Sequence, residues 1–216
     1  MMINLPKNKT MKYFSFLLFI FTFVGLVFFS ISPNAQQSDI KTKIARLAGG
    51  CFWCLESDFD KLDGIVRTTS GYSGGTIPNP TYENYHDKIE GFEPHVEVVE
   101  IEYNPEKISY EQIVHYHFKH IDPTDGKGQF CDRGAAYRPV IYVKNDEERA
   151  TAEKISDAVE ADLNQKVAVD ILDAKQFWAA EDYHQNYYKK NSIRYNLYRW
   201  KCGRDQRIED LWGTTK

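Results

Sequence analysis

Cysteine is scarce in this sequence. Four cysteines, at positions 51, 54, 131 and 202, are spread through 216 residues, too few for a small scaffold held together by disulfides. The sequence also lacks phosphate-binding glycine loops, internal repeats and low-complexity tracts. Its composition, 42% hydrophobic and 14% aromatic, instead suits one domain with a proper core.

An excess of basic residues is missing too. The chain has 27 Lys and Arg against 31 Asp and Glu, a formal net charge of −4. Residues 1–35 contain three of the lysines and no acidic residue, so the remainder carries a formal charge of −7. An acidic domain with scattered lysines lacks the positive surface that nucleic acid requires, so we expect no nucleic-acid partner.

Residues 1–35 have the order of a secretory signal peptide. Lysines come first, an apolar run from Phe14 to Ile31 follows, and small polar residues end the segment. A run of this length could also be kept as an N-terminal membrane anchor. With either outcome we expect an exported protein, periplasmic or extracytoplasmic. A linker over 36–42 then leads to a catalytic domain over 43–216.

Hydrophobic periodicity predicts strands and helices that mix without strict alternation. This pattern favours an α+β fold, a two-layer sandwich of helices on a mixed β-sheet with a ferredoxin-like core. Two segments, 71–95 and 126–138, show no period, and loops of such length are generally functional or mobile. The predicted strands cover 43–48, 65–72, 95–105, 139–145 and 167–172, and the predicted helices cover 51–63, 109–122, 146–163 and 179–191.

Cys51 follows a predicted strand and a Gly-Gly turn and stands at the start of a predicted helix. Backbone N–H groups and the helix dipole at that end favour an anion, so we expect Cys51 to ionise more readily than a free cysteine. Phe52 and Trp53 would form an apolar wall beside the sulfur. A buried, inert Cys51 with both aromatics in the core is the alternative.

Glu97 lies in the alternating strand "HVEVVEIEYNP" and shares a face with Val99 and Ile101. A carboxyl group on an apolar face has a raised pKa, because burial disfavours its charged form. Glu97 is therefore a candidate proton donor near neutral pH. If the end of the strand is exposed, Glu97 is instead an ordinary solvated carboxylate.

Six segments together resemble the A-type peptide-methionine sulfoxide reductases. They are "GGCFWCLE", "GYSGGTIPNPTYE", "HVEVVEIEY", "SYEQIV", "HIDPTDGKGQFCDRGAAYR" and "AEDYHQNYYKKN", and the resemblance covers residues 44–191. It implies reduction of the S epimer of methionine sulfoxide, free or in oxidised proteins. A thioredoxin-like donor would supply the electrons, with no metal and no organic cofactor, and we expect a monomer.

The resemblance also implies roles for individual residues. Cys51 would attack the sulfoxide sulfur and become a sulfenic acid, while Glu97 protonates the oxygen. A second thiol would then form a disulfide with Cys51, and the donor would reduce it. The remaining implied residues are Tyr82 and Tyr137 as donors to the sulfoxide oxygen, Asp132 as an active-site aspartate, and Phe52 and Trp53 as the pocket for the substrate methyl group.

The resolving cysteine stays open at this stage. Cys54 stands where the family more often has glycine, and the usual glycine-rich tail is replaced by a segment with one cysteine, Cys202. Cys54 is three residues from Cys51 at the start of the same helix, a separation that a disulfide can span. The candidates are therefore Cys54 and Cys202, with Cys131 as a third.

Two other classes of protein fit parts of the pattern. A C-x-x-C pair in an exported chain suits a thioredoxin-like thiol–disulfide oxidoreductase, although that interpretation gives no role to Glu97 or to residues 71–95. A zinc-stabilised binding module is the other alternative. It would need ligands beyond Cys51 and Cys54, and Cys131 and Cys202 stand far apart in the chain.

Overall fold

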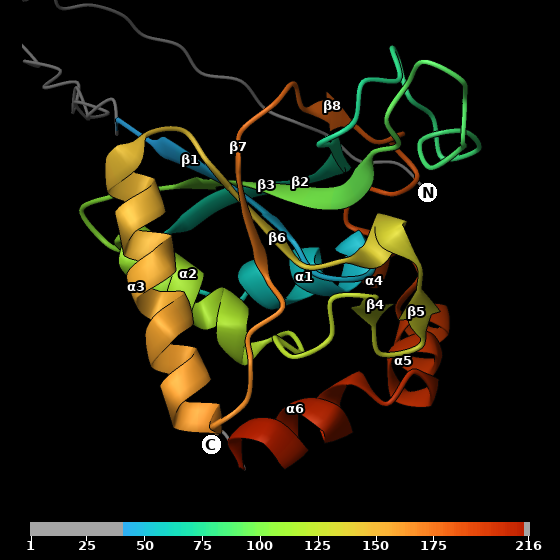
Figure 1. Cartoon of the computed structure of the whole chain (residues 1–216). Coiled ribbons are helices and arrows are strands. Elements are labelled where there is room, and N and C mark those ends of the chain that lie inside the picture. The colour runs from blue at the N-terminus through green and yellow to red at the C-terminus, as the bar shows by residue number, and fades with distance from the viewer. Residues whose placement is uncertain (1–40, 214–216) are drawn as a thin grey trace, which may run out of the picture. The chain divides into compact units, whose positions relative to one another are not determined.

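The computed structural model describes residues 41–213, and a mixed six-stranded β-sheet forms their centre (Figure 1). Its strand order is β7-β6-β1-β3-β2-β8. The β6–β7 pair is parallel and the other pairs are antiparallel. The strands of this sheet are β1 Lys43–Ala48, β2 Ile65–Ser73, β3 Val96–Tyr103, β6 Val140–Val143, β7 Asp170–Asp173 and β8 Trp178–Ala179.

Helices cover one face of this sheet. Apolar side chains of α1, α2 and α3 share a core with those of β1 and β3. The inner strands, in the order β6-β1-β3-β2, and helices α1 and α2 form a ferredoxin-like core, which confirms the predicted α+β sandwich. The three helices are α1 Phe52–Phe59, α2 Tyr110–Lys119 and α3 Asp146–Leu163.

A capping box starts α2, as the Ser109–Gln112 spacing favours. The side chain of Ser109 accepts a hydrogen bond from the N–H of Gln112, and the side chain of Gln112 accepts one from the N–H of Ser109. The apolar face of the helix, including Ile113 and Phe118, is fully buried. The capping box therefore determines where this helix begins, and the spacing of its apolar residues determines which face is buried.

Strand β3 carries Glu97 onto the helix-covered face of the sheet. Val99 and Ile101 belong to the same core as α1, while Val96 and Val98 belong to a smaller cluster on the opposite face. Glu97 is only 2% exposed. The alternation of side chains along the strand predicted this placement, and the solvated alternative for Glu97 is wrong.

The segment between β2 and β3 is irregular, as predicted, but it is held in place. His95 accepts a hydrogen bond from the N–H of Gly75 at 3.1 Å, and its other ring nitrogen lies 2.8 Å from the carbonyl oxygen of Ile77. The N–H of Thr76 donates to the carbonyl of Glu93 at 2.9 Å. Tyr85 is consequently buried rather than solvated.

Three predicted elements differ from the structure. Residues 126–138 contain a short hairpin and a 3₁₀ turn, and the strand predicted over 167–172 begins at Asp170. The helix predicted over 179–191 is mostly wrong. The elements concerned are β4 Gly128–Gln129, β5 Asp132–Arg133, the turn Ala135–Tyr137 and α4 Tyr187–Lys190.

Hydrogen bonds from one side chain explain the missing part of that helix. The amide of Gln185 accepts from the N–H of Ser70 and donates to the carbonyl groups of Ser70 and Ala180. These bonds hold residues 180–186 as turns against β2. Tertiary contacts thus override the local helical pattern here.

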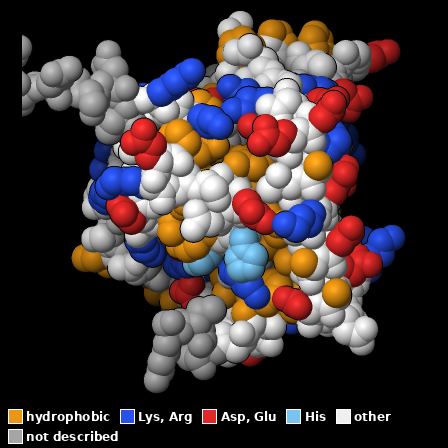
Figure 2. All heavy atoms as spheres, turned by 90° about the vertical axis from the view of Figure 1, so that its left-hand side faces the viewer, with side chains coloured by type: hydrophobic (Ala, Val, Ile, Leu, Met, Phe, Trp, Pro, Cys, Tyr) orange, Lys and Arg blue, Asp and Glu red, His pale blue; other side chains and the backbone are white. Residues whose placement is uncertain are grey.

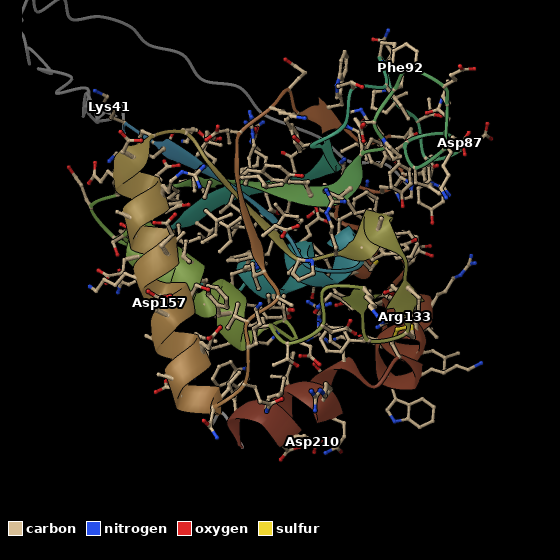
Figure 3. All side chains as sticks on the ribbon, viewed as in Figure 1. Lys41, Asp87, Phe92, Arg133, Asp157 and Asp210 are labelled. Carbon is tan, nitrogen blue, oxygen red and sulfur yellow. A yellow bond between two sulfur atoms is a disulfide. The ribbon has the colours of Figure 1, made fainter. Side chains whose placement is uncertain are left out.

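Two helices form the end of the described chain, for which we predicted no element. They are α5 Ser192–Lys201 and α6 Arg204–Trp212; in Figure 1, α5 lies below the β4–β5 hairpin and α6 lies at the bottom of the molecule. Cys202 follows α5 directly. It forms a disulfide with Cys131, which lies between β4 and β5. The bond lies close to the labelled Arg133 in Figure 3.

The side of the molecule that carries α3 and α2 mixes charges of both signs (Figure 2). Lys154 of α3, for example, lies 3.1 Å from the carboxylate of Glu111 of α2. Within residues 41–213 no helix is both long and apolar enough to cross a membrane. The predicted signal or anchor over 1–35 lies outside the described residues and remains a prediction.

Candidate active site

Cys51 lies at the junction of β1 and α1. It is the N-cap residue of α1, and the preceding Gly50 has φ +82°, a conformation that favours glycine. A Cβ on Gly49 would lie 2.5 Å from the side chain of Ile121, so this turn packs closely under α2. The thiol of Cys51 is free and the residue is 7% exposed. This placement at the helix start is the predicted one.

The ionisation of Cys51 differs from expectation. Burial, interaction with the Cys54 thiol, and the nearby carboxyl groups of Glu97 and Asp132 raise the pKa of Cys51 well above its ordinary value. The helix start was expected to stabilise the Cys51 thiolate through its free N–H groups. The first N–H of α1, that of Phe52, instead donates to Glu97. The prediction that Cys51 ionises readily is therefore wrong for the resting site.

Glu97 lies against the start of α1. One carboxyl oxygen accepts a hydrogen bond of 2.8 Å from the N–H of Phe52, and the other accepts one of 3.0 Å from the hydroxyl of Tyr85. Burial raises the pKa of Glu97 to about 8, although both hydrogen bonds oppose the change. The group therefore carries a proton at neutral pH beside Cys51.

Tyrosine hydroxyls surround this carboxyl group. Tyr137, at the end of the 3₁₀ turn, interacts with Tyr85, and burial raises the pKa of both phenols so that they stay protonated. Tyr82 is 38% exposed at the edge of the site. Its N–H donates to Glu181 at 2.8 Å. All three can act as neutral hydrogen-bond donors.

Phe52 and Trp53 form an aromatic wall with residues from the C-terminal part of the chain. The indole of Trp53 stacks on Tyr187 with ring centroids 3.7 Å apart. Its N–H donates to Nδ1 of His184 at 3.0 Å. The ring of His184 in turn lies 5.0 Å from that of Phe52. These contacts hold the indole of Trp53 in position beside Phe52.

Asp132 approaches Cys51 from the β4–β5 hairpin. Its carboxyl group accepts a hydrogen bond from the hydroxyl of Tyr198, and burial raises its pKa. The disulfide between Cys131 and Cys202 joins this hairpin to the end of α5. Asp132 is therefore held in the site by its hydrogen bond with Tyr198 and by the disulfide of the adjacent Cys131.

Cys54 lies one helical turn from Cys51 and also has a free thiol, in a residue that is only 2% exposed. Interaction with Cys51, and the positive charges of Arg204 and Arg199, lower the pKa of Cys54 although burial opposes this. The two arginines therefore favour the ionised form of Cys54.

The structure brings together Cys51, Glu97, Tyr82, Tyr137, Asp132, Phe52, Trp53 and Cys54, as predicted. A sequence model of the family "Peptide methionine sulfoxide reductase" matches residues 43–216. The chain belongs to this family. Membership decides against the thioredoxin-like oxidoreductase and against the non-catalytic binding module.

Individual relatives of the reductase agree. It is 44% identical to "Peptide methionine sulfoxide reductase MsrA 2" of Rhizobium meliloti over 196 residues, 90% of this chain and 93% of that protein. It is 43% identical to "Peptide methionine sulfoxide reductase MsrA/MsrB" of Vibrio cholerae over 189 residues, 87% of this chain but 47% of that longer protein. The structure of Mxr1 from Saccharomyces cerevisiae in reduced form matches with a TM-score of 0.64 at 30% identity, covering 70% of this chain and 86% of that one.

Several residues of the reductase site were not predicted. Tyr85, His184 and Tyr198 contact Glu97, Trp53 and Asp132 respectively. In the sequence, Tyr85 is one of three tyrosines in residues 71–95, a segment that has neither helical nor strand periodicity. His184 and Tyr198 lie in parts of the chain whose fold local pattern did not predict, so only the tertiary structure reveals them.

Proposed function

We propose that this reductase converts the S epimer of methionine sulfoxide to methionine with Cys51 as the nucleophile and Glu97 as the proton donor. The observation that carries the proposal is the hydrogen bond between Glu97 and the N–H of Phe52, the residue directly after Cys51. It holds a protonated carboxyl group next to the sulfur, where a sulfoxide oxygen would gain negative charge during attack.

In the first step the sulfur of Cys51 bonds to the sulfoxide sulfur. Glu97 gives its proton to the oxygen, and the hydroxyls of Tyr82 and Tyr137 donate hydrogen bonds to it. Methionine leaves, and Cys51 becomes a sulfenic acid. The sulfoxide oxygen and the proton from Glu97 become the hydroxyl group of that sulfenic acid, and the proton of the Cys51 thiol replaces the one on Glu97, so the step balances without a metal or organic cofactor.

Phe52 and Trp53 would hold the methyl group of the substrate. Their rings are fixed by His184 and Tyr187, so the wall keeps its shape when a small apolar group binds. A sulfoxide whose methyl group contacts this wall has a defined position for its oxygen. Only one epimer then points its oxygen toward Glu97 while offering its sulfur to Cys51.

We propose Cys54 as the resolving cysteine. Its thiol is free and one helical turn from Cys51, whereas Cys202 and Cys131 are bonded to each other. The Cys54 sulfur attacks the sulfur of the Cys51 sulfenic acid. A disulfide forms, the S–O bond breaks, and the oxygen leaves as water. A thioredoxin-like dithiol then reduces this disulfide by thiol exchange.

An epimer-resolved assay tests the proposal. Wild-type protein should reduce the S epimer with a dithiol reductant, and Cys51→Ser should reduce neither epimer. An insulin-disulfide assay run beside it should show no comparable activity. Full turnover by Cys51→Ser would contradict the catalytic assignment, and Cys131→Ser/Cys202→Ser, assayed at low temperature, serves as a control for loss of cysteines outside the pair.

We further propose that the protein is exported and acts as a monomer. The sequence of residues 1–35 supports export, and so does the Cys131–Cys202 disulfide, since oxidising compartments maintain such bonds. Cell fractionation with mass spectrometry of the recovered protein tests this. A product lacking residues 1–35, or a full-length product in the membrane, is expected. A full-length cytoplasmic product would contradict export.

A further inference from the structure

Arg204 is a buried cation that the mechanism above does not use. This first residue of α6 is 1% exposed. Its guanidinium donates to the carbonyl oxygen of His120 at 2.8 Å and to that of Gly49 at 3.4 Å, and it lies 4.6 Å over the ring of Phe130. The Nε atom has no hydrogen-bond partner.

The guanidinium of Arg204 lies along the segment that carries both free thiols. At one end it contacts Gly49, and a Cβ on Gly50 would lie 3.4 Å from its Nη1. At the other end its Nε is 3.8 Å from the carboxylate of Asp58. Cys54 is four residues before Asp58 and therefore on the same side of α1. Arg204 thus flanks the side of α1 that carries Cys54.

Among the described residues, no carboxylate lies within hydrogen-bond distance of Arg204. The buried carboxylate of Asp58 is 2.9 Å from Arg199 of α5 but 3.8 Å from Nε of Arg204. Arg199 is also hydrogen-bonded to Asp205, whose side chain is 65% exposed to solvent. Burying a cation without a close partner is costly. A negative charge on Cys54 would balance it.

We propose that Arg204, assisted by Arg199, is a positioning residue that stabilises the Cys54 thiolate during its attack on the Cys51 sulfenic acid. This inference rests on the proposed function. In the step the Cys54 sulfur is oxidised and the sulfenic sulfur is reduced. The new S–S bond replaces the S–O bond, and the departing hydroxide takes up one proton to become water.

The other ionisable groups named near Cys54 are carboxyl groups, phenols and a thiol, and none of these can stabilise a thiolate with a positive charge. Burial raises the pKa of the two nearby phenols, and Glu97 stays protonated below about pH 8. The arginines remain charged throughout that range. The groups facing Cys54 are Cys51 and Asp58 from α1, Glu97 from β3, Tyr195, Tyr198 and Arg199 from α5, and Arg204 from α6.

A single-turnover experiment separates the two steps. Methionine release reports the chemistry of Cys51, and loss of the remaining thiols reports disulfide formation, both followed against pH in one sample. In Arg204→Gln we expect normal methionine release and about tenfold slower disulfide formation at neutral pH, with recovery at higher pH as more Cys54 ionises. Arg204→Lys, which keeps the charge, should restore most of the rate.

Arg207→Gln is the matched control, since Arg207 lies on the same helix and pairs with Asp122 instead. Its disulfide step should equal that of wild type. Wild-type rate and pH profile in Arg204→Gln would overturn the inference, and so would Arg204→Lys as slow as Arg204→Gln. If Arg204→Gln does not fold, Arg199→Gln carries the same expectation and the same contrary outcome. Failure of wild type to release methionine would instead contradict the proposed function.

Discussion

Tyr85 donates a hydrogen bond of 3.0 Å to the carboxyl group of Glu97, and both side chains are almost completely buried. The bond favours the ionised carboxylate, while burial favours the neutral acid by more. The pKa near 8 is the balance of these opposed effects. Tyr85 therefore adjusts the pH range in which Glu97 can donate a proton.

Replacing Tyr85 by phenylalanine should raise the pKa of Glu97 further. Loss of one hydrogen bond to the charged form should shift the alkaline limb of the pH–rate profile for methionine formation to higher pH, by about one unit. Single-turnover rates across pH measure this shift. Tyr110→Phe is the control, because the hydroxyl of Tyr110 has no hydrogen-bond partner. An unchanged limb in Tyr85→Phe would exclude this role.

Glu97→Gln should slow methionine formation by about 100-fold, since a positioned proton donor contributes at least that much. Glutamine keeps the shape of the side chain and lacks the acidic proton. In wild type the rate should fall as pH rises through about 8, because the protonated form of Glu97 disappears there. The variant should lack this limb. Glu100→Gln, on the same strand but paired with Arg46, should behave as wild type.

Cys54→Ser should release about one methionine per enzyme and then stop when thioredoxin is the reductant. The first step needs only Cys51, whereas recycling needs a second thiol to form the disulfide. Quantified methionine in a burst assay measures this. Normal recycling by the variant would transfer the resolving role to Cys131 or Cys202.

Removing the Cys131–Cys202 disulfide should destabilise the fold and spare the chemistry. The bond spans 71 residues of sequence, and a crosslink of that length contributes about 4 kcal/mol in the chain-entropy account. Urea unfolding of Cys131→Ser/Cys202→Ser should show a loss of this order. At low temperature the folded variant should recycle with thioredoxin, and failure to do so would place these cysteines in the catalytic cycle.

Local pattern predicted the two central groups of the site. A strand, a Gly-Gly turn and a helical period located Cys51, and alternation along β3 located Glu97. Both depend on regular elements whose side-chain directions follow from the backbone. The same reasoning failed for the pKa of Cys51, because burial and groups brought there by the tertiary structure raise it, among them Glu97, which bonds to Phe52 from 45 positions away in sequence.

The C-terminal part of the chain was beyond such reasoning. His184 lies in turns held by Gln185, and these side-chain bonds to β2 replace the expected helix. Arg204 is buried only because α6 lies under the Gly49–Gly50 turn. Distances between segments so far apart in sequence are set by the whole fold, which no local period encodes.

The unequal exposure of the two free thiols has a consequence for the order of events in turnover. Cys51 is 7% exposed and Cys54 only 2%, so we expect the incoming dithiol to attack the Cys51 side of their disulfide, where the proposed mechanism also places the substrate. Substrate and reductant therefore compete for one entrance. The enzyme should follow ping-pong kinetics, with high concentrations of sulfoxide slowing its own re-reduction.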